Sequence, residues 1–331
     1  MLDERKAAIL RELVEEYIRA GEPVSSRAIV ECGLDCSSAT VRNELAVLES
    51  DGFIVKPHTS AGRIPTDRGY RYYLDHLAPG SLRRATRDRI ASFFSSMHSG
   101  FGQMLQETSE LLSEITHHPA VVVGPGLHGQ TVRDAHLIPI EPNEVLMVLV
   151  TGGGSVNQAV LRLAGPVAPA EVTAAAEALE ARLIDRVLDG EQTADRGEEA
   201  EGLPAPVIDL YDRALEAVDA AAAGQRKVYL GGTAWMATLW EDIAQLQRIL
   251  SVLDHQANLV GLVGDGPGGT RVRLGPELPA GEEDLAVVST EYEASGGSGR
   301  MGVFGPLRMD YRRTIRVIEE VSDQLGESLG G

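Results

Sequence analysis

The segment from Ser37 to Arg71 constrains the fold of this 331-residue chain more than any other part of the sequence. Serines precede a short helical pattern, and a strand, a loop of small polar residues and a return strand follow it. Ser37 or Ser38 can cap the helix with a side-chain oxygen, and Gly52 can end it. The segment therefore predicts a helix over 38–51 followed by a β-hairpin.

Two helices are predicted before this segment and one after it. Apolar residues recur at helical spacing over residues 4–20, and Gly21 ends that pattern. Either serine of the pair at 25–26 can cap a second helix, and Thr66 can cap a fourth helix that follows the hairpin. This order of elements predicts a winged helix-turn-helix over residues 1–78.

The helix over 38–51 has two chemically different faces. Val41, Leu45 and Leu48 share one face and are expected in the core. On the opposite face an arginine can pair with guanine and an asparagine with adenine. Taken alone, this pattern is equally compatible with a plain solvated helix face. The outward-facing residues are Ser38, Arg42, Asn43 and Ala46.

The loop between the two predicted strands contains no bulky apolar residue. Its sequence, PHTSAG at 57–62, offers short hydroxyls, a ring nitrogen and amide groups, which suit contacts to phosphate and sugar. Residues 52–73 hold four basic residues against one acidic residue, although the whole chain has a net charge of −19. A basic stripe on an acidic body can still bind DNA, with a steep salt dependence. The predicted DNA-binding residues are Ser37, Ser38, Thr40, Arg42, Asn43, Lys56, His58, Thr59, Ser60, Gly62 and Arg63.

The rest of the chain alternates between strand and helix patterns. A polar, basic stretch over 79–92 is expected to be a linker or a linking helix, and a helical pattern follows over 91–115. The apolar run at 145–150 is continuous, which favours a strand buried on both faces. Residues 166–256 are alanine-rich and helical, and a last helix begins at Tyr311. Strands are expected at 120–123, 132–140, 145–150, 259–263, 270–274, 285–290 and 302–304.

The segment from 233 to 253 carries an apolar stripe wide enough for a helix–helix contact. A two-fold DNA site calls for a two-fold protein, so this stripe and the alanine-rich helices before it are the predicted dimer contact. The stripe comprises Leu239, Ile243, Leu246, Ile249, Leu250 and Leu253.

No catalytic or metal site is predicted. Glycine-rich runs at 152–155 and 264–269 match neither the phosphate-loop nor the dinucleotide pattern and are expected to be hairpin turns. Cys32 and Cys36 lack the further ligands of a zinc site and are expected to be reduced thiols beside a turn. With no secretory signal and no apolar run of membrane-spanning length, the protein is expected to be cytoplasmic, without a cofactor and not an enzyme.

Two other patterns have plain structural explanations. His117 and His118 lack a carboxylate or a third histidine at ligand spacing, which favours a solvated turn. The run RMDY at 308–311 has the composition of a ligand clamp, but Asp310 just before a helix is also an ordinary cap.

Several runs at the two ends of the chain carry a family resemblance. They are GEPVSS at 21–26, SATVRNEL at 38–45, PHTSAGR at 57–63 with PT at 65–66 and GYR at 69–71, and GPLRMDY at 305–311. Together these motifs resemble the heat-inducible transcription repressor HrcA family. Because they lie at both ends, the resemblance extends over essentially the full chain, with a loose match at roughly 166–225.

The HrcA resemblance implies an α+β fold in which the winged helix precedes a GAF-like α/β domain with an inserted helical dimerisation segment. It also implies repression of chaperone operons through the inverted repeat called CIRCE, with a GroEL-type chaperonin favouring the DNA-binding form. The implied domains are a winged helix at 1–78, a linker at 79–92, a GAF-like domain at 93–165 and 257–331, and a dimerisation domain at 166–256.

The leading hypothesis is a dimeric, sequence-specific DNA-binding repressor of heat-shock chaperone operons. Its expected partners are double-stranded DNA, a second copy of the chain and a GroEL-type chaperonin, with no membrane. The alternative is a metabolite-responsive winged-helix regulator whose GAF-like domain binds a small effector. A metabolite that shifts operator affinity or the melting temperature would favour the alternative.

Overall fold

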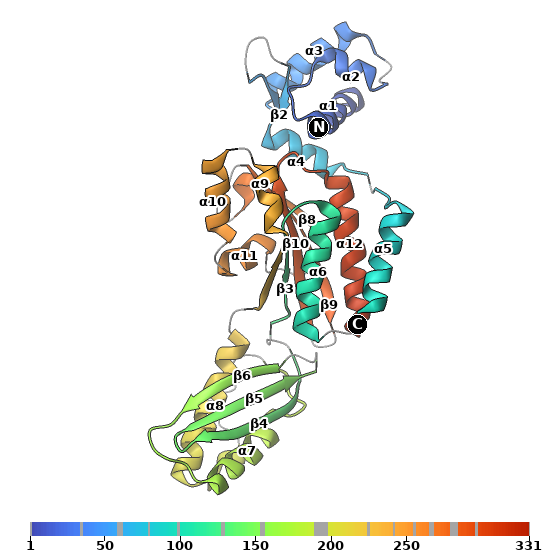
Figure 1. Cartoon of the computed structure of the whole chain (residues 1–331). Helices are drawn as coiled ribbons and strands as arrows, with labels where there is room; N and C mark the ends of the chain where they lie inside the picture. Colours follow the sequence, from blue (N-terminus) through green and yellow to red (C-terminus); the bar gives the residue numbers. More distant parts are fainter. Residues whose placement is uncertain are drawn as a thin grey trace.

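A computed structural model of the chain describes residues 2–33, 36–57, 62–78, 80–97, 100–126, 130–152, 156–188, 198–223, 226–240, 242–253, 256–264, 268–278, 284–294 and 297–330. The fold combines helices with antiparallel sheets, which agrees with the predicted α+β class. Three units follow one another in space, namely an amino-terminal unit, a central body and an insert (Figure 1). Within the described ranges, no helix is both long enough and apolar enough to cross a membrane.

The amino-terminal unit consists of α1 (Glu4–Ala20), α2 (Ser26–Glu31), α3 (Ser38–Ser50), the hairpin strands β1 (Ile54–Val55) and β2 (Ile64–Pro65), and α4 (Asp67–Asp75). Gly21 ends α1 in the left-handed conformation, as predicted. Of the two candidate serines at each helix start, Ser25 caps α2 and Ser37 caps α3. Thr66 caps α4, so all three predicted cap positions are confirmed.

The central body is built on a five-stranded antiparallel sheet in the order β7-β3-β10-β9-β8. Helices α6 (Phe101–Thr116) and α12 (Tyr311–Ser328) cover one face, and α5 (Arg84–Ser96) packs outside α12 (Figure 1). The other face is covered by α9 (Met236–Leu239), α10 (Ile243–Leu253) and α11 (Gln256–Val263). The strands are β3 (Ala120–Val123), β7 (Val228–Gly231), β8 (Arg271–Leu274), β9 (Leu285–Ala294) and β10 (Gly297–Pro306).

Strand β3 shows how one short apolar run serves both faces of this sheet. Ala120 and Val122 pack into the core on the side of α6 and α12, whereas Val121 and Val123 pack into the core on the side of α11. Successive side chains of a strand point to opposite faces, so a central strand covered on both sides must be apolar throughout.

The insert lies between β3 and β7 in the sequence and forms a unit with its own core. Strands β4 (Val132–Glu141), β5 (Glu144–Thr151) and β6 (Val156–Arg162) make a three-stranded antiparallel sheet. One face of this sheet packs against α7 (Pro169–Leu183) and α8 (Ala205–Ala223). Among the described residues, the members of this core, such as Met147, Leu179 and Leu210, all come from the insert.

The boundaries of the insert differ from the predicted 166–256. Strands β4 to β6 share a core with α7 and α8, so the unit begins near residue 130. At its end, β7 pairs with β3, and Ile249 of α10 packs with Val121 in the body core. Residues 228–253 therefore belong to the body. Helical periodicity shows that one face of a helix is buried, but it does not show which part of the chain covers that face.

Several local predictions also need correction. Of the two alternatives for 79–92, the linking helix is confirmed, because most of the segment is helix α5, whose Ile90 and Phe94 are buried. The helical pattern at 91–115 is divided between α5 and α6. The expected strand at 259–263 is part of helix α11, because a short apolar run does not distinguish a buried strand from a buried helix. Strands β6 and β7 were not predicted.

The apolar run at 145–150 forms strand β5, but only one of its faces is fully buried. The insert core takes alternate side chains, while the intervening ones are half-buried on the side away from α7 and α8. Neighbouring strands extend this second surface, which we call the outer sheet face. Its apolar members are Ile138, Leu146, Val148, Val150, Val156 and Val160, of which Ile138, Val156 and Val160 are 47%, 47% and 51% exposed, and Asp134, His136 and Gln158 lie on the same face.

Candidate nucleic-acid interface

Helix α3 is held in place by one apolar face and by its first turn. Val41, Leu45 and Leu48 are fully buried in a core shared with α1 and α2. The Ser37 Oγ accepts a hydrogen bond from the Thr40 N–H at 3.1 Å and lies 2.9 Å from the Thr40 Oγ1. Both hydroxyls are therefore engaged in the helix cap, and these two predicted DNA contacts have a local structural role.

The opposite face of α3 is accessible to a partner. Arg42, Asn43 and Ala46 are exposed, and Ser38 is half-buried beside them. The Arg42 Nε donates a long hydrogen bond of 3.4 Å to the Ser26 Oγ at the start of α2. A hydrogen bond of this length is weak, so the guanidinium can exchange it for a base edge or a phosphate.

The base of the hairpin is tied to the segment before α2. Val24 and Arg63 exchange two backbone hydrogen bonds of 2.9 Å. Gly62 lies so close to this segment that a Cβ atom added to it would be 2.5 Å from the Val24 carbonyl oxygen. A glycine is required at this position by the close backbone approach, which gives Gly62 a structural role in place of the predicted DNA contact.

The two basic residues of the hairpin differ in accessibility. The Arg63 side chain is only 14% exposed, and its Nε donates to the Glu49 Oε2 at 3.1 Å, so Arg63 braces the hairpin base. The Lys56 ammonium lies 4.0 Å from the same carboxylate and is 40% exposed, which leaves it able to reach a phosphate. The other predicted loop contacts, His58, Thr59 and Ser60, lie outside the described residues.

The sequence prediction omitted two residues at the start of α2. Ser26 receives the hydrogen bond from Arg42, and Arg27 has a side chain that is 86% exposed and paired with Glu31 at 2.9 Å. The serine pair at 25–26 could have indicated these residues. Ser25 caps α2, so Ser26 and Arg27 lie in the first turn of α2, where Ser26 contacts Arg42 of α3.

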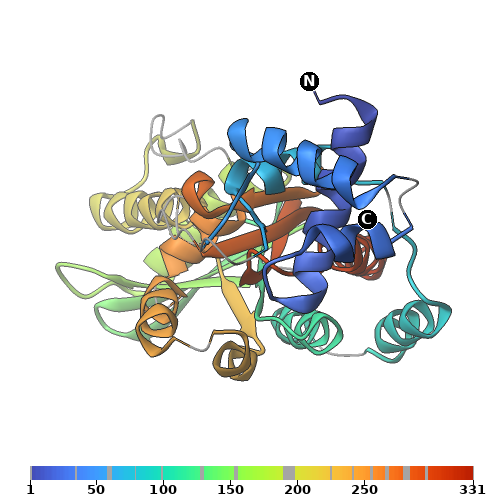
Figure 2. The ribbon, with the colours of Figure 1, turned by 90° about the horizontal axis from the view of Figure 1, so that it is seen from above.

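The amino-terminal unit is packed firmly onto the body. Tyr70 of α4 and Tyr311 of α12 are both buried, with ring centroids 6.3 Å apart, and burial raises the pKa of both phenols. The Arg71 Nε donates to the Glu277 Oε1 at 2.9 Å across the same boundary. Seen from above, the amino-terminal unit overlies α12 and the large sheet (Figure 2). The position of α3 is therefore set by the body.

The predicted dimer stripe is divided by the fold. Most of it packs into the chain's own core and cannot meet a second copy in this arrangement. Ile243 and Leu250 remain 72% and 38% exposed. The members that pack into the body core are Leu239, Leu246, Ile249 and Leu253.

Two groups of potential metal ligands do not form a convincing site. Asp134, His136 and Glu180 place ligand atoms within 4.8 Å of one another in the insert. Each ring nitrogen of His136 already faces a carboxylate, at 3.1 Å from Asp134 and 3.6 Å from Glu180, and all three side chains are well exposed. Cys32 and Cys36 are free thiols, and partial burial, reinforced by nearby Glu16, raises the pKa of Cys32.

Comparison with known proteins gives the class of this chain. Residues 102–315 match the family model of the HrcA protein C-terminal domain. A heat-inducible transcription repressor HrcA from Halalkalibacterium halodurans is 34% identical, over 99% of this chain and 98% of its own length. The corresponding repressor from Kocuria rhizophila is 37% identical over the full length of both chains. The class is therefore a transcription repressor, which is a regulator and not an enzyme.

A solved structure has a similar overall fold. The crystal structure of a hypothetical protein superimposes with a TM-score of 0.64 over 99% of both chains, at 24% sequence identity. This chain belongs to the HrcA family of heat-inducible transcription repressors.

Proposed function

We propose that the chain represses transcription by binding DNA through a winged helix-turn-helix formed by residues 2–78. The observation that supports this proposal best is the exposed pair Arg42 and Asn43 on a helix whose opposite face is fully buried. A helix held in this way can enter a major groove without losing its own core contacts.

The exposed residues divide into two roles. Arg42 and Asn43 would contact base edges, because arginine pairs bidentately with guanine and asparagine with adenine. Lys56 and Arg27 would contact phosphate, since a flexible exposed cation neutralises the backbone without reading sequence. Ser26 would hold Arg42 in place until DNA replaces that weak bond.

Two substitutions separate these roles. Arg42→Ala should cost about 1–3 kcal/mol on the matched operator and relax the preference for one base pair. Lys56→Ala should weaken all sequences alike and reduce the salt slope by about one. Selection of bound DNA by each variant, followed by titrations at several salt concentrations, measures both effects. Uniform losses for both variants on matched and scrambled operators would contradict the assignment.

We further propose that the outer sheet face of the insert holds two copies together. Ile138, Leu146 and Val160 lie side by side across the three strands, and two of them are about half exposed. An apolar surface of this kind on a soluble chain marks a protein contact. An inverted-repeat operator requires a two-fold partner, so the expected occupant is a second copy.

Charged substitutions test whether the dimer contact is the outer sheet face or the exposed residues Ile243 and Leu250 of α10. Ile138→Asp should convert the dimer to a monomer in sedimentation equilibrium and weaken operator binding. Ile243→Asp, at a more exposed apolar position of the body, should leave the dimer intact. The opposite result would move the dimer contact to α10.

The proposed target is a CIRCE-type inverted repeat at chaperone operons, and the proposed modulator is a GroEL-type chaperonin that favours the DNA-binding form. We also propose that the body is a GAF-like domain. The family membership supports this target. A regulator that unfolds under heat reports free chaperone capacity through its folded fraction. After heat inactivation, chaperonin with nucleotide should restore operator binding. Equal recovery without chaperonin would count against the modulator.

A further inference from the structure

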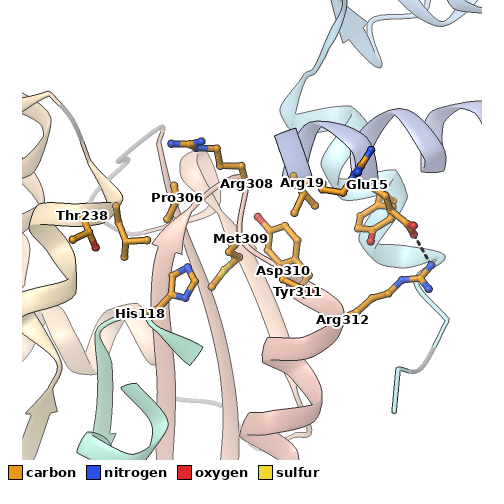
Figure 3. A pocket seen from close by; sticks show the side chains of 13 residues that line it. Glu15, Arg19, His118, Thr238, Pro306, Arg308, Met309, Asp310, Tyr311 and Arg312 are labelled. Atoms are coloured by element: carbon orange, nitrogen blue, oxygen red, sulfur yellow. Dashed lines mark ion pairs between the residues drawn. The ribbon is translucent and has the colours of Figure 1, made fainter. Parts of the chain in front are cut away.

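A cavity of about 560 Å³ lies at the junction of the amino-terminal unit and the body. Its walls come from α1, α4, α9, the turn between α6 and β3, and the corner between β10 and α12 (Figure 3). We call it the junction pocket. Its volume lies within the range of small-molecule sites, and pockets at boundaries between units are a common place for them.

The lining combines an apolar wall with charged groups. Ile18, Leu239, Met309 and Tyr311 supply apolar surface from both units. Figure 3 shows side chains approaching from the amino-terminal side and from the body around one space. This composition, an apolar body with a few polar groups, suits a small molecule that has an apolar part and a polar end.

Most charges in the lining already have partners within the chain. Arg312 pairs with Glu15 at 2.6 Å, as the dashed line in Figure 3 marks. The Arg19 Nε donates to the Glu16 carboxylate at 3.0 Å. Asp310 caps α12 by accepting from the Arg313 N–H at 3.0 Å. These groups are therefore not the ones that would select a ligand.

Arg308 is different because it is exposed and, within the described part of the chain, no hydrogen bond or ion pair holds its guanidinium. Its Nη1 lies 2.5 Å from the position that a Cβ atom would take on Gly21, so the side chain rests against the end of α1. A helix carboxy terminus favours a cation there, which positions the group while leaving its donors available. A free guanidinium fork matches a carboxylate.

His118 offers the complementary group on the body side of the pocket. Its Nδ1 is 2.7 Å from the Thr116 carbonyl oxygen, so Nδ1 carries the proton and Nε2 is an acceptor in the neutral ring. Burial lowers the pKa of His118, which keeps the ring neutral. The ring is held against Gly305, where an added Cβ would lie 2.5 Å from its Cδ2. A ligand hydroxyl can donate to Nε2.

We propose that the junction pocket binds a small hydroxylated organic acid, with its carboxylate on Arg308, its hydroxyl on His118 and its apolar part against Met309 and Leu239. Both units line the pocket, so a bound ligand favours the arrangement in which they are packed together. Because that arrangement positions α3, occupancy changes operator affinity. This last step rests on the proposed DNA-binding function.

The test uses salicylate as the probe, because it combines an aromatic ring, a carboxylate and a neighbouring hydroxyl. Calorimetric titration into the full-length protein should show one saturable site with a Kd below about 1 mM. Arg308→Ala should weaken binding by about tenfold or more, and Arg308→Lys should weaken it less. Arg84→Ala, which removes an exposed cation on α5 that lies 3.7 Å from Asp88, should leave binding unchanged.

Benzoate, which lacks the hydroxyl, tests the second contact. The wild type should bind salicylate more tightly than benzoate, and His118→Gln should reduce that difference. Thermal unfolding of each variant checks that it is folded, and Arg308→Lys takes the place of Arg308→Ala if the alanine variant is not. The site is overturned if salicylate fails to saturate the wild type, or if the Arg84 and Arg308 variants behave alike.

Operator affinity is measured separately, with and without salicylate. A shift in the wild type that is absent in Arg308→Ala supports the coupling, and a bound probe with unchanged DNA affinity overturns it. Loss of DNA binding in all proteins with intact probe binding would instead count against the proposed function, because the titration contains no DNA.

Discussion

The two units that flank the central body are attached to it in opposite ways. Residues of α1, α3 and α4 share one continuous core with α12 and the large sheet, and ion pairs such as Arg71–Glu277 cross the boundary. The insert has a separate core whose described members come from β4 to β6, α7 and α8 alone. One unit is therefore fused to the body, whereas the other is joined to it mainly through its two chain connections.

This difference fits the two contacts proposed above. A DNA-binding helix must be presented at a fixed angle, and the core that α3 shares with the body would fix that angle. A unit with its own core can fold and pair without disturbing the body, which suits an element that sets the distance between two copies. The proposed DNA and dimer contacts lie at opposite ends of the chain's long axis (Figure 1).

The largest expected effect comes from breaking the shared core. Tyr311→Ala removes a fully buried ring that packs near Tyr70 and donates to the Leu307 carbonyl oxygen at 2.7 Å. The free energy of unfolding should fall by about 3–5 kcal/mol, and the amino-terminal unit should become protease-sensitive. Tyr292→Ala, which empties a buried site in the body away from the junction, is the control for body destabilisation alone. Unchanged protection of α1 in the Tyr311 variant would argue against a fused unit.

A slightly smaller effect is expected in the insert core. Leu210→Ala creates a cavity under α8 and should cost about 2–5 kcal/mol, but only in the insert. Hydrogen exchange should show faster exchange for amides of β4 to β6 while those of α12 keep their protection. If α12 lost protection to the same degree, the insert would not be a separate cooperative unit.

A smaller effect is expected for the ion pair at the junction. Arg71 and Glu277 are both partly exposed, so Arg71→Ala should lower stability by about 0.2–1 kcal/mol. The matched control is Arg162→Ala, which removes an ion pair with Glu144 inside the insert and should not change the stability of the junction. Double-mutant cycles from urea unfolding measure both coupling energies. If the two coupling energies were equal, the Arg71–Glu277 pair would not distinguish the junction from the insert.

The smallest expected effect concerns a single imidazole beside the junction. Burial lowers the folded-state pKa of His118 below its ordinary value of 6.5. The unfolded state then binds more protons as the pH falls, so stability decreases below about pH 6.5 until the folded-state ring is itself protonated. His118→Gln should remove this component. Identical slopes of stability against pH in wild type and variant would contradict the prediction.

The amino-terminal unit could be predicted closely because its signals are local. Ser25, Ser37 and Thr66 form hydrogen bonds to amides three residues away, and Gly21 adopts a conformation that other residues avoid. The exposure of Arg42 follows from helical geometry once the apolar face is known. Its place in a DNA groove remains a prediction.

Elsewhere the local sequence pattern did not show which residues cover an apolar face or pair with a charged side chain. The stripe on α10 was predicted as a contact between copies, but the body's own core covers Ile249 and Leu253. Arg63 was predicted on the surface, but Glu49, from a helix fourteen residues earlier, holds it at the hairpin base. In each case the partner lies too far along the chain for spacing to reveal it.

The sequence by itself determined the helix starts and stops of the first 78 residues, the polar face of α3 and, through motifs at both ends, the family. Only the tertiary structure decided where the insert begins, which apolar faces are covered by the chain itself, and that a pocket forms between α1 and the corner before α12. The physical reason is the separation along the chain between the groups that interact. Caps and turns depend on backbone groups a few residues apart, whereas burial depends on what long-range packing brings against a face.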